Sequence, residues 1–350
     1  MEPKPPISDR RWLRLLAASA GLVMPLVWLL TTVTPSEVTV RVRNALGASV
    51  GVPADFHWTL EEVPRGFLSS TVTPPAEFRK IAGSLDAAVA SAEPRSGFDL
   101  SLAISRDLMR APKRVGTPIR APALETYRQI TEQGRGYCAD FVKAFNGIAL
   151  AADMPVRQWG FAFTAFGSGH TFNEIYDRGR GKWLLVDSFH SLYFVDPQTR
   201  EPLSTLEVHD RLLSLDPQRR GAEIARIVPG RFPFRSDAMA LDYYRVGMRQ
   251  LWLVWGNNIL DFERHPVTGP VSRVSRGAGQ LLGLANGQYP TIRIHPAGVS
   301  GRDLRELFRA RDELFLPLAC CVISALLFGP QLFQLLRDRR AQPGRREPQT

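Results

Sequence analysis

The stretch GRGYCADFVKAFNGIALAADMPVRQWGF at residues 134–161, followed by GHTFNEIYDRGRGKWLLVDS at residues 169–188, decides the fold of this chain. Residues Cys138 to Ala152 are strongly apolar, begin after a loop with two glycines and end before Pro155. An apolar run bounded in this way by glycine and proline predicts a buried helix. A cysteine therefore stands at the first position of a predicted helix.

The segments on either side of that helix predict the rest of the fold. Short apolar runs separated by glycine-rich turns at 167–169 and 178–181 predict strands. The predicted strands are Val156–Phe166, Thr171–Tyr176 and Trp183–Val186, and two further helices are predicted at Asp99–Ala111 and Ala121–Gln133. Helices followed by a run of antiparallel strands indicate an α+β fold.

The flanking regions give weaker patterns. Val38–Val42 alternates as a strand does, Arg302–Glu313 predicts a charged helix, and residues 265–300 are rich in Gly and Pro, which predicts irregular structure. Leu251–Leu260 is apolar but too short to cross a bilayer. We expect it to pack in the core, with a surface that rests on a membrane as the alternative.

Three residues on separate elements suggest acyl-transfer chemistry. Cys138 is the only cysteine outside the C-terminal apolar stretch. Unpaired amide groups and the helix dipole at a helix start favour a thiolate, and the Cys138 N–H can stabilise an oxyanion. His170 and Asp187 lie on neighbouring predicted strands, where they can face each other across the ladder. A nucleophile, a base and an orienting anion are what such chemistry needs.

These segments resemble the core of the transglutaminase-like superfamily. That core joins a Gly-x-Cys helix start to a His–aromatic–Glu strand and a Trp-to-Asp strand, and the likeness covers residues 99–196. The resemblance implies a papain-like fold, with helices packed on an antiparallel sheet, and a triad of Cys138, His170 and Asp187. It also implies hydrolysis of amide or peptide bonds more than cross-linking.

Two residues depart from the family pattern, and others are expected around the triad. Phe172 stands where Trp is common, and Ser188 follows the Asp where Pro is usual. The side chains expected to surround the triad are Tyr137, Asp140, Phe172, Glu174 and Gln133. The family's second oxyanion donor lies upstream of the Cys, where Gln129 and Gln133 are the candidates. His190 is at most a neighbour of the site.

No metal and no cofactor are expected. A Cys, a His and an Asp can ligate zinc, but no CxxC or HxxxH pair accompanies them in the sequence. No calcium-binding loop is recognisable either.

Two long stretches without charge predict membrane spans. Residues 15–36 and 314–336 are each long enough to cross a hydrocarbon core of about 30 Å. The first could instead be a cleaved signal peptide, but no small-x-small cleavage site follows it. The second could be a buried core helix. Basic residues before the first stretch and after the second predict that both termini are cytoplasmic.

This topology puts the main domain outside a bacterial inner membrane, in the periplasm. The predicted segments are a cytoplasmic N-terminus (1–14), a span (15–36), the first part of the outer domain (37–95), the transglutaminase-like core (96–204), a C-terminal extension (205–313), a second span (314–336) and a basic cytoplasmic tail (337–350).

The net charge of +10, from 44 Lys and Arg against 34 Asp and Glu, does not indicate a nucleic-acid partner. Part of the excess lies in residues 1–14 and 337–350, where basic residues set membrane topology. No basic cluster interleaved with aromatic residues stands out, which argues against nucleic-acid binding.

Two functions therefore remain open. The first is a membrane-anchored cysteine enzyme acting through a thioester on Cys138, with protein, peptide or peptidoglycan stem-peptide substrates in the cell envelope. The second is a non-catalytic scaffold of the same fold, which docks onto envelope or surface-polysaccharide assembly proteins. The long region 205–313 motivates the second hypothesis.

Overall fold

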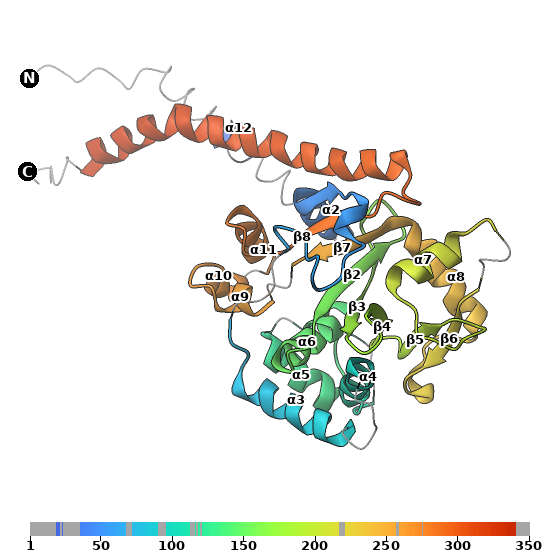
Figure 1. Cartoon of the computed structure of the whole chain (residues 1–350). Helices are drawn as coiled ribbons and strands as arrows, with labels where there is room; N and C mark the ends of the chain where they lie inside the picture. Colours follow the sequence, from blue (N-terminus) through green and yellow to red (C-terminus); the bar gives the residue numbers. More distant parts are fainter. Residues whose placement is uncertain are drawn as a thin grey trace, which may run out of the picture. The chain divides into compact units, whose positions relative to one another are not determined.

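A sheet of six strands organises the chain in the computed structural model (Figure 1). The structure describes residues 19–21, 23, 36–67, 72–89, 96–112, 116, 118–119, 121–216, 221–256, 259–274 and 276–340. By contacts it divides into two units, residues 1–42 with 308–350, and residues 43–307. The sheet and the predicted site both belong to the second unit.

The strand order is β1-β8-β7-β2-β3-β4, with every neighbouring pair antiparallel except β1 and β8. The strands are β1 (Ala48–Val50), β2 (Val156–Ala162), β3 (Gly169–Asp177), β4 (Lys182–Val186), β7 (Leu251–Trp255) and β8 (Thr291–Ile294). The three predicted strands are confirmed. The first ends early, at Ala162, because Ala165 and Phe166 take positive φ values of 39° and 58° and turn the chain.

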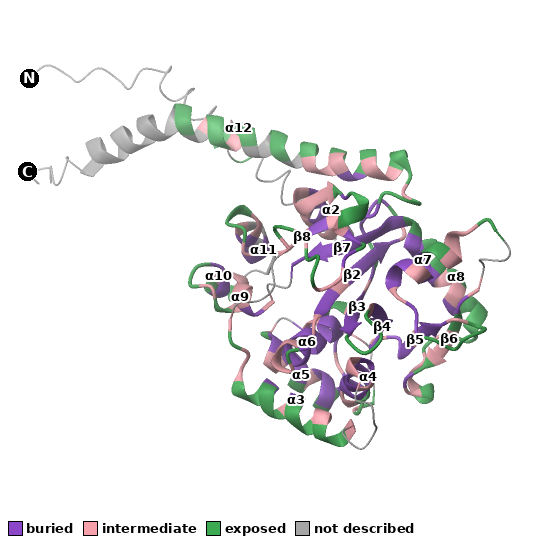
Figure 2. Ribbon diagram, viewed as in Figure 1, coloured by how far each residue is buried: buried purple, intermediate pink, exposed green. Residues whose placement is uncertain are grey.

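Helices cover one face of this sheet. They are α3 (Ala76–Val89), α4 (Gly97–Leu108), α5 (Ala123–Gln133) and α6 (Cys138–Ala151). Phe145 and Ile148 of α6 are fully buried and pack in one cluster with Ile175 and Leu184 of the sheet. Figure 2 shows the sheet and the inner sides of these helices as buried. The predicted α+β architecture, with helices packed on a mostly antiparallel sheet, is confirmed.

The opposite face carries a second core. It is covered by α7 (Thr205–Leu213), α8 (Asp237–Gly247) and a two-stranded sheet of β5 (Leu192–Val195) and β6 (Glu223–Arg226). Trp159, Phe172 and Leu253 come from paired positions of β2, β3 and β7 and share this core with Tyr244 of α8. The second face matters for function because β3 points His170 toward it, in line with Phe172.

Two predictions about the flanking regions are wrong. Val38–Val42 lies in a helix, α2 (Ser36–Gly47), so the alternation of its valines does not set the local structure. Residues 265–300 are not irregular, since they form α10 (Thr268–Val274), α11 (Arg276–Ala285) and β8. Gly279 of α11 allows a close approach, because a Cβ there would lie 2.1 Å from Ser272 Oγ of α10. The glycines in this region permit packing and do not break the helix.

The described residues of the apolar run at Leu251–Leu260, which are 251–256 and 259–260, pack in the core as predicted. All five residues of β7 are buried, and the strand lies between β8 and β2. The run continues into a short helix, α9 (Ile259–Arg264). The sheet thus takes strands from all three predicted segments of the outer domain, 37–95, 96–204 and 205–313.

Among the residues that the structure describes, no helix is both long and apolar enough to cross a membrane. The predicted N-terminal segment 1–14 and most of the predicted span 15–36 lie outside the described residues. Residues 314–336 lie within α12 (Gly301–Arg340), which includes the charged helix predicted at Arg302–Glu313. The two spans are therefore not confirmed. The last residues of the predicted tail, 341–350, also lie outside the described part.

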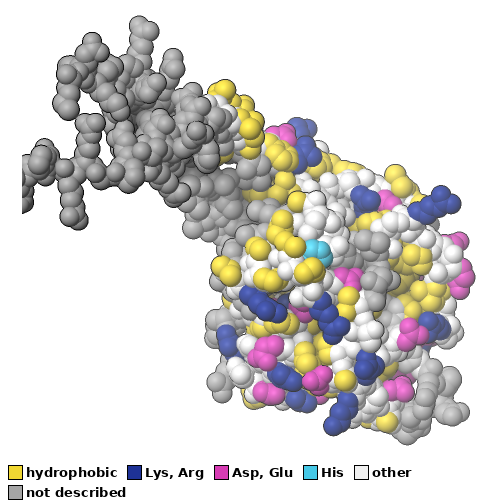
Figure 3. Space-filling model, turned by 90° about the vertical axis from the view of Figure 1, so that its left-hand side faces the viewer, with side chains coloured by type: hydrophobic (Ala, Val, Ile, Leu, Met, Phe, Trp, Pro, Cys, Tyr) yellow, Lys and Arg dark blue, Asp and Glu magenta, His cyan; other side chains and the backbone are white. Residues whose placement is uncertain are grey.

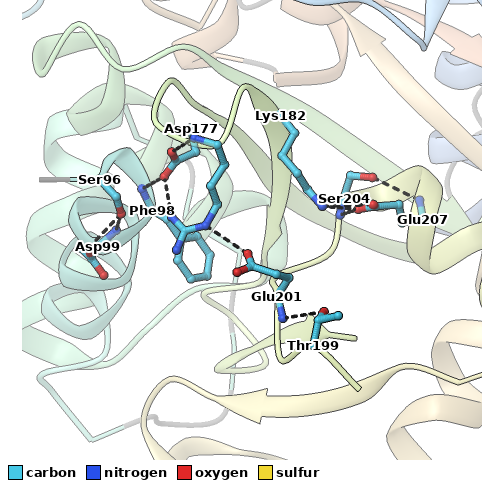
Figure 4. A network of polar contacts seen from close by, with 10 residues as sticks. Ser96, Phe98, Asp99, Asp177, Lys182, Thr199, Glu201, Ser204 and Glu207 are labelled. Carbon is cyan, nitrogen blue, oxygen red and sulfur yellow. Dashed lines mark hydrogen bonds and ion pairs between the residues drawn. The ribbon is translucent and has the colours of Figure 1, made fainter. Parts of the chain in front are cut away.

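A polar network ties the end of β3 to the start of α4 (Figure 4). The buried Asp177 carboxylate accepts hydrogen bonds from Phe98 N at 3.0 Å and Arg180 N at 2.9 Å. Arg180 reaches on to Glu201 at 3.4 Å. On the face that Figure 3 shows, Lys and Arg side chains are interspersed with Asp and Glu side chains.

Candidate active site

Cys138 is the first residue of α6, and the loop before it is held in a defined shape. Gly136 has a φ of 112°, which glycine adopts readily and which L side chains disfavour. The Asp140 carboxylate accepts hydrogen bonds from Tyr137 N at 3.0 Å and Ile119 N at 3.1 Å. Cys138 is a free, half-buried thiol. At a helix start the first amide groups have no partner within the helix, so they are suited to stabilise a negative charge near the sulfur.

His170 and Asp187 are in direct contact. His170 Nε2 lies 2.5 Å from Asp187 Oδ2, and the two residues are 3% and 0% exposed. Both positions follow from the hairpin of β3 and β4, in which Asn173 pairs with Val186 and Asp187 comes directly after. Because Nε2 is held by the carboxylate, Nδ1 is the ring nitrogen left for another partner.

Electrostatics in this pocket favour a charged pair. Burial works against protonation of His170. The charge of Asp187 and its hydrogen bond outweigh this effect, with smaller contributions from Cys138, and raise the His170 pKa to about 10. Burial likewise opposes ionisation of Asp187, but the charges of His170 and His190 lower its pKa well below the usual range. An imidazolium beside a carboxylate is thus the stable state of this pair.

Two residues outside the predicted triad also contact Asp187. The sequence did not predict Tyr244 at all and predicted His190 at most as a neighbour of the site. The Tyr244 hydroxyl donates a hydrogen bond to Asp187 Oδ2. His190 donates its backbone N–H to Asp187 Oδ1 at 2.9 Å, and its ring stacks on His170 with centroids 4.1 Å apart. Nothing in the sequence around Tyr244 indicates that it contacts Asp187. His190 could have been expected to do so, because it follows Asp187 by only three residues.

Tyr244 keeps its proton at this position. Burial and the negative charge of Asp187 raise the Tyr244 pKa well above its usual value. Burial and the same carboxylate also raise the pKa of the neighbouring Tyr243. The protonated Tyr244 hydroxyl donates to Asp187 Oδ2 and lies 3.1 Å from His190 Nδ1. It therefore fixes the carboxylate that in turn orients His170.

Three of these residues have side chains of the types that ligate metals. His170, Asp187 and His190 bring ligand atoms within 4.8 Å of one another. The two imidazole planes are stacked at 24°, however, and lone pairs that lie in nearly parallel planes do not meet at one ion. One Asp187 oxygen already contacts both rings, at 2.5 Å and 3.2 Å. The donor set fits a hydrogen-bonded cluster better than a metal centre.

The other predicted neighbours of the triad have different positions. Phe172 is buried and lies against His170, with ring centroids 6.0 Å apart. Tyr137 is 46% exposed beside Cys138. Gln133 is exposed at the end of α5, so no contact supports its choice as an oxyanion donor.

Glu174 belongs to a separate buried network and is a structural residue. Its carboxylate accepts hydrogen bonds from Arg157 Nε at 2.6 Å, Trp159 Nε1 at 2.6 Å and Thr205 N at 2.7 Å. These partners use the carboxylate on both oxygens. Glu174 lies on the same face of β3 as His170, four residues further along the strand. It is therefore near His170 in the sequence, but its partners belong to a different network.

The His170 pKa gives a pH-dependent contribution to stability. A folded pKa of about 10, raised from the unfolded value of about 6.5, stabilises the fold fully below about pH 6.5 and loses that contribution as the pH rises through 10. We expect the free energy of unfolding of the wild type to exceed that of His170→Gln by roughly a few kcal/mol near pH 6. This difference should shrink as the pH rises toward 10. Urea unfolding at several pH values measures it. The exposed His57→Gln is the control, and a difference constant with pH would contradict the charged pair.

Comparisons with known proteins give little help. No protein-family model matches this chain, and no curated protein matches it. A solved structure from Cytophaga hutchinsonii, provisionally described as a cysteine protease, matches with a TM-score of 0.27 and 20% identity. The match covers 39% of this chain and 44% of the other, so it spans less than half of that protein. At this TM-score the likeness assigns no fold, and the site's own geometry carries the functional inference.

Proposed function

We propose that this chain is a cysteine acyl-transfer enzyme that hydrolyses amide or peptide bonds. The observation that carries the proposal is the buried contact of His170 Nε2 with Asp187 at 2.5 Å, combined with the influence of Cys138 on the same imidazole. The position of Cys138 at the start of α6 adds to it. These three residues correspond to the triad that the resemblance to transglutaminase-like proteins implies.

The chemistry assigns one role to each residue. The Cys138 thiolate attacks the carbonyl carbon, and the Cys138 N–H stabilises the oxyanion. As the C–N bond breaks, His170 gives its proton from Nδ1 to the departing amine, which leaves a thioester on Cys138. His170 then takes a proton from water, whose oxygen attacks the thioester and releases the acid and the thiolate. Asp187 stabilises the imidazolium throughout.

We also propose, from the sequence, that residues 15–36 and 314–336 anchor the chain in a bacterial inner membrane, with residues 37–313 in the periplasm. Envelope proteins, peptides and peptidoglycan stem peptides would then be the accessible substrates. A periplasm-dependent reporter fused after Glu201 is expected to be active. A fusion that is expressed but inactive would reverse this orientation.

The proposed function is tested by the reactivity of Cys138. We expect iodoacetamide to alkylate it rapidly at pH 7, at a rate that falls at least about tenfold in His170→Ala, since the ion pair that supplies the thiolate is lost. Peptide mapping of the full chain separates Cys138 from Cys320 and Cys321, which serve as internal reference thiols. If Cys138 reacts no faster than those two, or is indifferent to His170, the enzyme hypothesis fails.

A further inference from the structure

A cavity of about 180 Å³ lies on the α6 face of the main sheet, next in the chain to the candidate active-site residues Cys138 and His170. Its lining includes Ala139 and Thr171, which directly follow Cys138 and His170 in the chain. Pockets that hold drug-sized ligands measure roughly 300–1,000 Å³, so this cavity suits a single side chain or a terminal group. Its size, and its lining by the residues that follow the proposed nucleophile and base, suit it to a group of the substrate near the bond under attack.

One wall of the cavity is apolar. It is formed by Trp252 and Val254 of β7, Phe262 of α9 and Ile292 of β8. The two β7 residues are 8% and 9% exposed. Surroundings of this kind lower the local dielectric, so any charge among the lining residues acts more strongly than it would in water.

The charged residues of the lining are all positive. Arg43 and Lys143 line the cavity, and no Asp or Glu does so among the described residues. Lys143 is compensated, because its Nζ lies 3.3 Å from Glu263 and donates to Ala121 O at 2.7 Å.

Arg43 is not compensated in this way. Its guanidinium donates to Asn44 Oδ1 at 2.9 Å and 3.3 Å, and this acceptor is a neutral amide. The Asn44 amide is itself held, since its Nδ2 donates to Phe166 O at 2.8 Å. Within the described part of the chain, no carboxylate forms an ion pair with Arg43. A cation that is positioned by a fixed amide and has spare donors suits an anionic ligand.

We propose that this cavity binds a carboxylate of the substrate through Arg43, so that the enzyme prefers acidic peptides. This inference rests on the proposed function, because the carboxylate would belong to the peptide that Cys138 attacks. A planar carboxylate can accept two hydrogen bonds from the guanidinium, while the apolar wall packs against its methylene groups. The carboxylate is that of an acidic side chain or of a free C-terminus.

Binding to the Cys138→Ala chain tests this inference without chemistry. The probes are fluorescein-labelled hexapeptides with an amidated C-terminus, carrying Glu or its neutral isostere Gln at successive positions, and an alanine hexapeptide with a free C-terminal carboxylate. We expect a carboxylate to improve affinity about 10- to 100-fold, as a charged hydrogen bond does. The Glu and free-terminus peptides distinguish the two sources. Arg43→Gln should abolish the preference, Arg43→Lys should keep part of it, and Arg245→Gln, an exposed arginine on α8, should leave it intact.

The outcomes separate this inference from the proposed function. Equal affinity for Glu and Gln peptides, or a preference that survives in a folded Arg43→Gln, would overturn the carboxylate site even if Cys138 proves reactive. An Arg43-dependent preference together with an unreactive Cys138 would uphold the carboxylate site and reject the enzyme. Circular dichroism shows whether each Arg43 variant is folded, and Arg43→Lys supplies the comparison if Arg43→Gln is not.

Discussion

Hydrolysis of a susceptible peptide is expected to fall by at least about 10⁴-fold when Cys138 is replaced by alanine. The variant lacks the atom that forms the thioester, and none of the neighbouring groups can supply another nucleophile of comparable strength. Alanine is a favourable residue in a helix, so α6 should still form. Mass spectrometry of peptide mixtures incubated with each protein measures the loss.

The control for this prediction is Cys320→Ala, which removes a thiol outside the site and should leave turnover unchanged. Asp187→Asn should also lower turnover strongly while leaving Cys138 in place, because the imidazolium loses its stabilising charge. A Cys138→Ala chain that still hydrolyses peptides would contradict the mechanism. If it also sustains the function of the wild type in cells, the scaffold hypothesis becomes the better one.

Removing the buried cation Arg157 is expected to destabilise the fold by about 3–5 kcal/mol. Its Nε contacts Glu174 at 2.6 Å, the two side chains are 2% and 0% exposed, and its guanidinium lies 4.1 Å from the centroid of the Trp183 ring. Arg157→Met leaves the Glu174 carboxylate buried without its counter-charge. Because a domain is stable by only about 5–15 kcal/mol, this loss is a large fraction of the total. Urea unfolding measures it.

A double-mutant cycle identifies the cause of that loss. Glu174→Gln removes the negative charge and keeps one acceptor oxygen, which can serve either Trp159 or Thr205 but not both. Because the stranded charge is gone, Arg157→Met with Glu174→Gln should still be more stable than Arg157→Met alone. The exposed Arg245→Met, whose partner Asp242 is also exposed, should change stability by less than about 1 kcal/mol. A double variant no more stable than the single one would show that lost packing of the Arg157 stem, and not the stranded charge, dominates.

Much of the helical and sheet structure could be predicted because it is encoded locally. The apolar run after Cys138 and the glycine turns beside β3 fix one helix and one hairpin from neighbouring residues alone. His170 and Asp187 are 17 positions apart on that hairpin, so their contact follows from it. The region from 265 to 300 was misjudged for the opposite reason. Its glycines look like breakers in isolation, and only the approach of α10 explains them.

What the sequence alone predicted is the choice of Cys138, His170 and Asp187 as candidate nucleophile, base and carboxylate, since each stands close to the start or end of an element with a clear pattern. Tertiary structure alone decided which other groups surround them. Tyr244 is 57 positions from the Asp187 it contacts, and Arg43 reaches the cavity from α2. It also assigned Glu174 to the Arg157 network and not to the site. Buried polar atoms must find partners wherever the chain brings them, and no local pattern specifies those partners.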